Sequence, residues 1–559
     1  MNSLKYLIVL AALVCFTASN SKAQATIQFL GGGSSALFLE LGQAAQSSAS
    51  TATPCVWTQA SSSNVLARDD RTSPTIDEKG NIFITWGHGT GTCAAPAGAF
   101  NVYSYMQLDS VVGDKCFFLT NSSSVSGCIQ VLTVAAGTAG ANLLGTGFGP
   151  DTPIPAAIIT ALNGKRFFVA GTDIRPEDAK FAAKRMFTTC GTTLTREPFG
   201  IGTYSTAGLG YQTSTTGVGV PVKSFFSTKQ FNVVDFNITG TDPITAKAVR
   251  AYVVNTVGAQ PIVIGVSPVP LGGTGISAAT DITTDALAEY LDGTSGRATD
   301  IQGPISANAM TVLVREPLSG TYNTMEYSVP NSLQFRTSQD ASNCLGTVVH
   351  SNPLDLPSAD GKVSGAARKR VIGTGEMVAE IQAATTDTLG YFFWSAGNAA
   401  KFTTTNGKYL TVNGVDPLVS SYSETNGVFP VTAAELANVN FANLNAGDYP
   451  IWSALRLVST SPTPAGVTNL IAGAQTLNST QHDFITLANL KVWHSHFTIG
   501  SIGVTAAANG ATISTVNDLC SGGNPEAGGD AGGANIQKHK NLDFCADFAS
   551  KTGVIDKNN

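Results

Sequence analysis

Short apolar runs alternate with segments of helical periodicity along most of this chain, a pattern typical of α/β proteins with parallel strands. The first apolar run, residues 26–30, leads into a glycine-rich turn and then an amphipathic stretch over residues 36–45. The other expected strands are 166–172, 261–267, 309–314, 388–393 and 454–458. The other expected helices are 155–163, 178–186, 285–291, one that begins near Tyr322, and 373–381.

Residues 47–146 interrupt this alternation. The section is rich in Ser, Thr, Asn and Gly, and its apolar runs are short and strand-like, at residues 82–86, 102–108, 116–119 and 129–134. We expect a β-rich elaboration there. The length of 559 residues implies more than one domain or lobe.

The N-terminus has the features of a signal peptide. Lys5 precedes an apolar run over residues 6–18, and Ser21-Lys22-Ala23 follows as a small-x-small cleavage pattern. The apolar run is too short to span a membrane. We expect cleavage after Ala23, with Ala25 as the alternative, and a periplasmic or secreted mature chain.

The cysteines agree with export. Removing Cys15 with the signal segment leaves eight of the nine, and an even set in an exported chain indicates disulfides. The local pairs Cys116–Cys128 and Cys520–Cys545 are the first expected. No C-x-x-C spacing occurs, so we expect neither a zinc site nor a redox dithiol, and no cofactor.

Charge narrows the range of partners. Charged residues make up only 13% of the chain, and loss of Lys5 and Lys22 on cleavage changes the net charge from −6 to −8. Binding to a phosphate backbone needs basic surface, so a nucleic-acid partner is not expected. A small anion can still be bound by local dipoles and a single arginine.

The stretch after strand 309–314 carries the most specific chemistry. Arg315 ends the strand, and Ser319-Gly320-Thr321 stands at the start of the next helix. A helix start presents free N–H groups and a positive dipole end, to which hydroxyls and a planar guanidinium add donors. Such a set suits a tetrahedral oxyanion, although Ser-Gly-Thr also serves as a plain helix cap.

Two further strand-to-helix turns carry polar side chains. Gly31-Gly32-Gly33 leads to Ser34 and Ser35, and Asp173 follows the strand at 166–172. Ligand-binding residues of open α/β sheets lie at such strand ends. Asp173 can equally cap the helix that follows it, and a plain cap is the favoured role of either serine taken alone.

The order of these motifs resembles the phosphate-binding proteins of ABC-type phosphate transporters. The resemblance rests on the glycine-rich first turn, Asp173, Arg315 with Ser319-Gly320-Thr321, and two later motifs, Leu389-Gly390-Tyr391 and Tyr449-Pro450-Ile451. It implies a two-lobed, periplasmic-binding-protein-like type II fold with the β-rich elaboration in the N-terminal lobe. The expected divisions are 1–23 signal peptide, 24–267 lobe 1, 268–449 lobe 2, and 450–559 the second part of lobe 1 with a Gly-rich tail.

The resemblance also implies a set of phosphate ligands. These are the hydroxyl of Ser35, the backbone N–H of Ala36, Asp173, Arg315, Ser319, Gly320, Thr321 and, as a substitute for the family's second-turn serine, Thr152. The family places an acid and then a small residue between its arginine and serine. This chain has Pro317 and Leu318 there, so that Glu316 is the only nearby acid.

We therefore expect a monomeric extracytoplasmic solute-binding protein that captures inorganic phosphate in an interlobe cleft for an ABC-type membrane permease. An enzyme is not expected, because the sequence presents no nucleophile–base pair or metal cluster; His494 and His496 are read as core or solvated side chains. Two alternatives stay open: a surface or structural protein that keeps the fold without tight phosphate binding, and a secreted phosphate-handling enzyme.

Overall fold

The structure is a computed structural model of the chain. It describes residues 24–49, 53–71, 75–145, 150–176, 236–267, 275–292, 310–315, 318–329, 367–371, 373–402, 407–420, 427–446, 448–477 and 483–486, with positions 73, 179, 297–298, 506–508 and 511–513. Within these ranges, no helix combines the length and the apolar character needed to cross a membrane.

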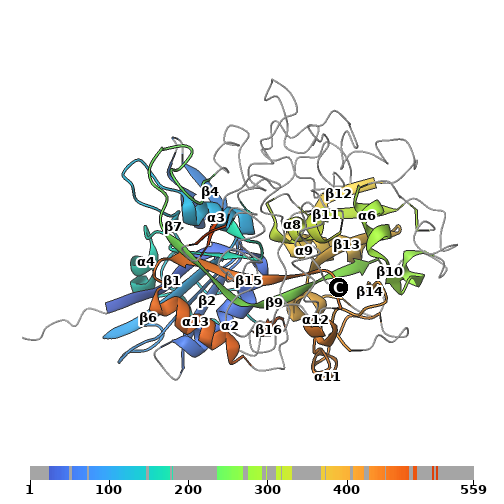
Figure 1. Cartoon of the computed structure of the whole chain (residues 1–559). Helices are drawn as coiled ribbons and strands as arrows, with labels where there is room; N and C mark the ends of the chain where they lie inside the picture. Colours follow the sequence, from blue (N-terminus) through green and yellow to red (C-terminus); the bar gives the residue numbers. More distant parts are fainter. Residues whose placement is uncertain are drawn as a thin grey trace, which may run out of the picture.

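One mixed sheet of 13 strands runs through the molecule and carries two halves (Figure 1). In the first half, β1 (Gln24–Gly33) lies between β6 (Ala99–Gln107) and β8 (Val169–Thr172) and is parallel to both. Beyond β6 the sheet continues antiparallel through β5 (Ile82–Trp86) to β2 (Cys55–Gln59). The first half therefore has the parallel centre that the alternating pattern predicts.

Helices cover both faces of the first-half sheet. One hydrophobic cluster joins it to α3 (Ser110–Phe118) and α4 (Ala156–Leu162), and a second joins it to α2 (Phe38–Ser48) and α13 (Ala465–Gln475). Leu30 belongs to the first cluster and its neighbour Phe29 to the second, because successive strand residues face opposite sides. A separate three-stranded sheet is formed by β3 (Val65–Asp69), β4 (Ile76–Lys79) and β7 (Ile129–Leu132).

The second half has its own core, built mainly from residues 259–454. Its central strand β11 (Thr311–Arg315) is parallel to β12 (Ala367–Val371) and β13 (Thr388–Phe393). The short strands are β10 (Asp281–Ile282) and β14 (Lys408–Val412), and the 3-10 turn is η6 (Ile276–Ala278). The helices are α6 (Thr284–Asp292), α8 (Gly320–Ser328), α9 (Gly373–Ala383), α10 (Ala396–Ala399), α11 (Ala433–Leu436) and α12 (Ala442–Ala446).

Two long strands cross between the halves. β9 (Tyr252–Val266) pairs antiparallel with β15 (Trp452–Thr460) over residues 252–261 and with β13 over residues 262–266. The short strands β16 (Ile485–Thr486) and β14 also pair with β9. A separate two-stranded sheet is formed by β17 (Ala506–Ala508) and β18 (Ala511–Ile513). Because β9 and β15 run against their neighbours, the sheet is mixed rather than wholly parallel.

Most predicted elements are confirmed. The strand expected at 388–393 coincides with β13, the helix at 373–381 lies within α9, and the helix at 155–163 contains α4. Mixed α/β architecture is therefore correct. The lobe boundaries at 267 and 449 stay predictions, and the helix expected at 178–186 lies almost wholly outside the described residues.

One prediction for residues 47–146 is wrong. Residues 116–119, expected as a strand, lie in helix α3 and the residue that follows it, because a short apolar run cannot by itself distinguish a strand from a buried helix. The section is β-rich as predicted, since it contains β2 to β7 and two disulfides, and its strand β6 also pairs with β1 in the main sheet. Gly31, Gly32 and Gly33, expected in a turn, form the end of β1.

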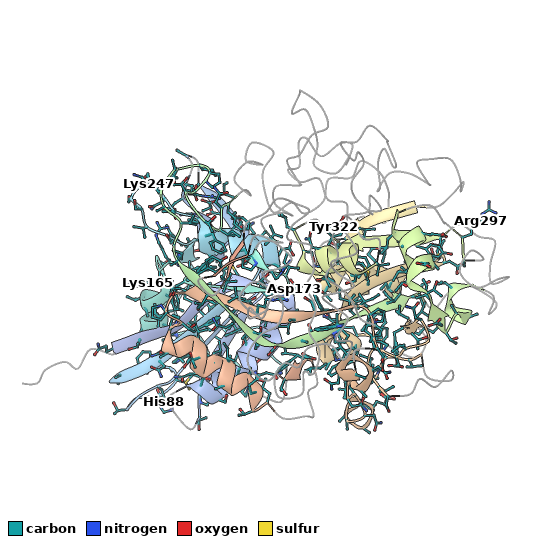
Figure 2. The ribbon with its side chains drawn as sticks, in the orientation of Figure 1. His88, Lys165, Asp173, Lys247, Arg297 and Tyr322 are labelled. Atoms are coloured by element: carbon teal, nitrogen blue, oxygen red, sulfur yellow. A yellow bond between two sulfur atoms is a disulfide. The ribbon has the colours of Figure 1, made fainter. Side chains whose placement is uncertain are left out.

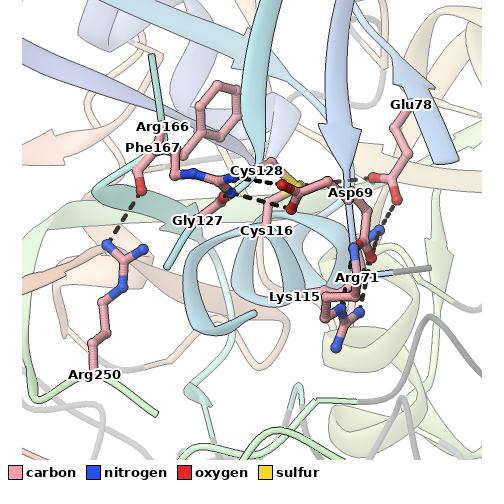
Figure 3. The surroundings of a disulfide bond; sticks show 11 residues. Asp69, Arg71, Glu78, Lys115, Cys116, Gly127, Cys128, Arg166, Phe167 and Arg250 are labelled. Carbon is pink, nitrogen blue, oxygen red and sulfur yellow. Dashed lines mark hydrogen bonds and ion pairs between the residues drawn. A yellow bond between two sulfur atoms is a disulfide. The ribbon is translucent and has the colours of Figure 1, made fainter. Parts of the chain in front are cut away.

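Helix α3 is buried along its whole length and is anchored at its C-terminal end (Figure 3). The predicted disulfide Cys116–Cys128 is confirmed, and a second joins Cys55 to Cys93; Cys520 and Cys545 lie outside the described residues. Beside the first disulfide, Lys115 forms ion pairs with Glu78 and, at 3.7 Å from Nζ to Oδ2, with Asp69.

This buried ion cluster includes a second cation. Arg71 contacts Asp69 at 2.9 Å and Asp242 at 3.1 Å. Burial opposes ionisation of Asp69, but Lys115 and Arg71 outweigh it and lower the pKa of that carboxyl. Burial lowers the pKa of Lys115 to about 7, although Asp69 opposes the shift. The cluster therefore ties α3 to β3 and β4.

We predict that Lys115→Met destabilises the fold by about 3 kcal/mol at pH 6, because it leaves the buried carboxylate of Glu78 without its cation. Urea denaturation of the mature chain measures the change. Lys165→Met, at an exposed lysine, is the matched control and should change stability by less than about 0.5 kcal/mol. Equal effects of the two substitutions would show that the cluster does not stabilise α3.

Candidate anion-binding site

Several helix starts meet where the two halves touch. The backbone N–H of Val111, in the first turn of α3, donates to the carbonyl of Leu318, just before α8, at 3.2 Å. Asp173, at the end of β8, lies at this junction, and Tyr322 of α8 lies across it (Figure 2). The junction thus brings together strand ends and helix N-termini from both halves.

Asp173 is at the centre of this junction and only 1% exposed. Its carboxylate accepts a hydrogen bond from the hydroxyl of Ser110, the first residue of α3. Gly320, the first residue of α8, approaches the same carboxylate so closely that a Cβ atom there would collide with it. The carboxylate therefore lies at the N-terminal, positive ends of two helices.

Arg315 ends β11 and is also 1% exposed. Its Nη1 donates to Thr374 Oγ1 at 3.1 Å and contacts Thr321 Oγ1 at 3.4 Å, so the guanidinium joins the starts of α9 and α8. Its Nη2 lies 3.9 Å from Oδ1 of Asp109, in the turn between β6 and α3. The arginine therefore has an acidic partner in the opposite half, whereas Glu316 lies outside the described residues.

Ser319 and Ser34 both cap helices, as the plainer interpretation of these motifs predicts. Ser319 Oγ accepts from the N–H of Tyr322 at 3.4 Å, at the start of α8. Ser34 Oγ accepts from the N–H of Ala36 at 3.2 Å, at the start of the 3-10 turn η1 (Ser35–Leu37). The Ala36 N–H, expected to bind a ligand, is thus directed to Ser34 in this structure.

A cavity of about 790 Å³ lies between the halves beside this junction. Ser35 and Ala36 line it from the first half, and Thr374, Gly375 and Trp394 from the second. Thr374 also accepts from Arg315 Nη1, so one hydrogen bond separates this wall of the cavity from the guanidinium. Ser35 and Ala36 therefore border open space, while Asp173, Arg315, Ser319 and Thr321 are buried and do not line the cavity.

Two buried carboxyls stand near the cavity. Burial and the neighbouring Asp483 raise the pKa of Glu40 well above its usual range. Burial likewise raises the pKa of Asp483, which lines the cavity, to about 7, and its Oδ1 accepts from the N–H of Ala396 at 2.6 Å. With a pKa of about 7, Asp483 is partly protonated near neutral pH, so it repels an anion in the cavity less than a fully ionised carboxylate would.

Thr152 is not brought to the junction with the other candidates. Its backbone N–H donates to the carbonyl of Val56 in β2, and β5 and β6 separate β2 from β1 in the sheet. The second strand-to-helix turn is instead the one between β6 and α3, which supplies Asp109 and Ser110.

Sequence reasoning missed Asp109, Ser110 and Thr374. A signal was available for the first two, because Asp-Ser directly follows a predicted strand, as at a helix N-terminus. Thr374 stands in the predicted Gly-Thr-Gly helix start, but only the fold brings that helix next to Arg315.

The polar groups of the junction suit a small oxyanion. The guanidinium of Arg315, the hydroxyls of Ser35, Ser110, Thr321 and Thr374, and the N-termini of α3, α8 and α9 are donors or positive dipole ends. Among the described residues there is no group of three or more His, Cys, Asp or Glu that could hold a metal ion. Recognition by hydrogen bonds and helix dipoles is the chemistry that this arrangement provides.

Comparison with known proteins gives no match to a protein-family model and none to a curated protein. Solved structures do match. The ancestral soluble variant of the human phosphate-binding protein covers 80% of this chain and 85% of its own, with TM-score 0.30 and 14% identity. An ABC-type phosphate transport receptor from Vibrio cholerae covers 40% of this chain and 67% of its own, with TM-score 0.23 and 14% identity.

A protein from Clostridium perfringens, solved with bound phosphate, covers 40% of this chain with TM-score 0.26 and 12% identity. The matched part spans about two thirds of that protein, 66% of its length. The names of these structure neighbours are those of the class that the motif order resembles.

We predict that Gly320→Ala loosens the junction between the halves, because the added methyl group would meet the Asp173 carboxylate and lie 2.5 Å from Ser110 Oγ. Overpacking of this kind destabilises by about 1–3 kcal/mol, measurable by thermal and urea unfolding. Gly397→Ala is the matched control, since its methyl group meets only Ser395 Oγ, at 3.7 Å. A Gly320→Ala chain as stable as that control would contradict the close approach of α8 to Asp173.

Proposed function

We propose that this chain is an extracytoplasmic solute-binding protein that captures inorganic phosphate between its two halves. The observation that carries the proposal is the buried Arg315, whose guanidinium joins Thr321 and Thr374 at two helix starts, beside the Asp173–Ser110 pair from the opposite half. A phosphate ion there would accept hydrogen bonds from both halves, and its charge would be met by the arginine and the helix dipoles.

Asp173 gives this site a means of choosing its anion. Monohydrogen phosphate carries a proton that an ionised carboxylate can accept in a hydrogen bond, whereas sulfate at neutral pH has none. Sulfate would therefore place an oxygen against the carboxylate without a hydrogen bond and be rejected by repulsion. Arsenate, which is also protonated, would bind like phosphate.

Binding at the junction would couple to movement of the halves. β9 and β15 connect them, while the contacts at the site include the hydrogen bond of Val111 with Leu318 and the 3.9 Å ion pair of Arg315 with Asp109, which a movement of the halves would break. A ligand that contacts both halves favours the closed arrangement. In the proposed role, this closed shape is the one that an ABC-type permease in the membrane recognises.

Calorimetric titration of the purified mature chain with phosphate, arsenate and sulfate tests the proposal. We expect one-site binding of phosphate and arsenate, and sulfate binding at least about 100-fold weaker, because the site penalises an unprotonated oxyanion. No heat and no change in thermal stability with millimolar phosphate would overturn the proposed function.

We predict that Asp173→Asn reduces this selectivity. The amide keeps an oxygen for Ser110 and removes the charge that repels sulfate, so the phosphate-to-sulfate affinity ratio should fall at least tenfold. Asp448→Asn, at an exposed carboxyl, makes the same change in net charge and should leave the ratio unaltered. An unchanged ratio in a folded Asp173→Asn chain would remove Asp173 from the selecting role.

A further inference from the structure

The cavity beside Arg315 is much larger than a phosphate ion. Its volume is about 790 Å³. A phosphate ion occupies roughly 100 Å³, on a scale where a water molecule takes about 30 Å³. Cavities of roughly 300–1,000 Å³ are typical of sites for organic ligands. Most of this space lies beyond the volume of a phosphate ion.

The cavity reaches the edge of the proposed anion site. Thr374 lines it and accepts the hydrogen bond from Arg315 Nη1 at 3.1 Å. Ser35 lines it from the opposite half. A ligand whose phosphoryl group reached Arg315 would therefore extend its remaining atoms into the cavity.

The walls combine apolar surfaces with carboxamides. Phe38 and Leu39 of α2 and Trp394 after β13 supply the apolar part. Side-chain amides line the same space from several elements: Gln43, Asn81, Gln107, Asn142 and Asn398. Each carboxamide has two donor hydrogens and two acceptor lone pairs. Asn81 donates through Nδ2 to Gln107 Oε1 and accepts through Oδ1 from the Ser61 N–H, both at 3.0 Å, and so keeps one hydrogen and one lone pair for a ligand.

This composition fits a ligand with many hydroxyl groups. Amides pair with hydroxyls as donors and as acceptors, and the C–H faces of a sugar ring suit apolar and aromatic walls. A hydrocarbon chain could use none of the donor hydrogens and lone pairs that these amides have left over from their bonds within the protein.

We propose that the site takes a phosphomonoester of a sugar or polyol, with the phosphoryl group at Arg315 and the hydroxyl-bearing part in the cavity. The inference rests on the proposed function for its phosphoryl-binding half and extends it to the class of ligand. The ester oxygen faces the cavity at Thr374, and the three terminal oxygens face Arg315, the helix starts and Asp173.

The protonation state of the phosphoryl group decides the pH at which the inference is tested. The second pKa of a phosphomonoester is about 6, so roughly half of it carries a proton at pH 6. Only that form can donate a hydrogen bond to an ionised Asp173. The comparison of esters with phosphate therefore belongs at pH 6.

Calorimetric titration of the full mature chain at pH 6 with glucose 6-phosphate, glycerol 3-phosphate, phosphate and glucose tests the inference. We expect glucose 6-phosphate to bind at least tenfold more tightly than phosphate, glycerol 3-phosphate to lie between them, and glucose alone to give no signal. The comparison needs no variant, so it does not depend on the folding of one.

A variant that fills the cavity tests the contribution of the cavity to binding separately from that of the anion site. Leu39→Trp should weaken binding of glucose 6-phosphate at least tenfold while phosphate affinity stays within twofold. Leu477→Trp is the control, at a half-buried leucine that does not line this cavity. Thermal unfolding establishes that both variants are folded.

The outcomes distinguish this inference from the proposed function. Phosphate binding with sugar phosphates at least tenfold weaker would overturn the inference and leave the phosphate receptor in place. Ester binding without measurable phosphate binding would support the inference and change the proposed ligand. Binding of neither would overturn both.

Discussion

The antiparallel pairing of β9 with β15 is the constraint on which the rest of the structure depends. These strands pass from the two hydrophobic clusters of the first half to the separate core of the second, and they hydrogen bond to each other across the boundary. On one side of the pair lies β13 of the second half, and on the other lies β8 of the first half. The register of β9 with β15 therefore decides which strand ends and helix starts of the two halves face one another. The junction around Asp173 and Arg315 follows from that register.

Charge burial gives this junction its chemical character. Arg315 and Asp173 are almost wholly excluded from solvent, and a buried charge is tolerated only where polar partners replace its hydration. Here the partners are hydroxyls and helix N-termini contributed by both halves. Helix α3 links this region to the cluster around Lys115, because its first residue contacts Asp173 while its C-terminal end is held by ion pairs and Cys116–Cys128.

Local patterns were sufficient for elements whose own residues decide their structure. The apolar run at 388–393, the helix start at Gly373 and the close cysteines Cys116 and Cys128 needed no knowledge of distant residues. Helix α3 escaped prediction because all of its residues are buried. A helix buried on every side lacks the alternation of apolar and polar faces by which an amphipathic helix is identified in a sequence. Thr152 was proposed because it precedes a helix in the sequence, but sheet order places it at the distant β2 edge.

By itself, the sequence determined the alternation of strands and helices, the arginine at the end of a strand and the hydroxyl-bearing helix starts, since these depend on residues within a few positions of each other. Only the tertiary structure decided that Ser110 faces Asp173, that Asp109 rather than a neighbour in the turn pairs with Arg315, and that a cavity opens at Thr374. The physical reason is that such contacts join residues 59 to 206 positions apart, and their energies arise only after the two halves have packed.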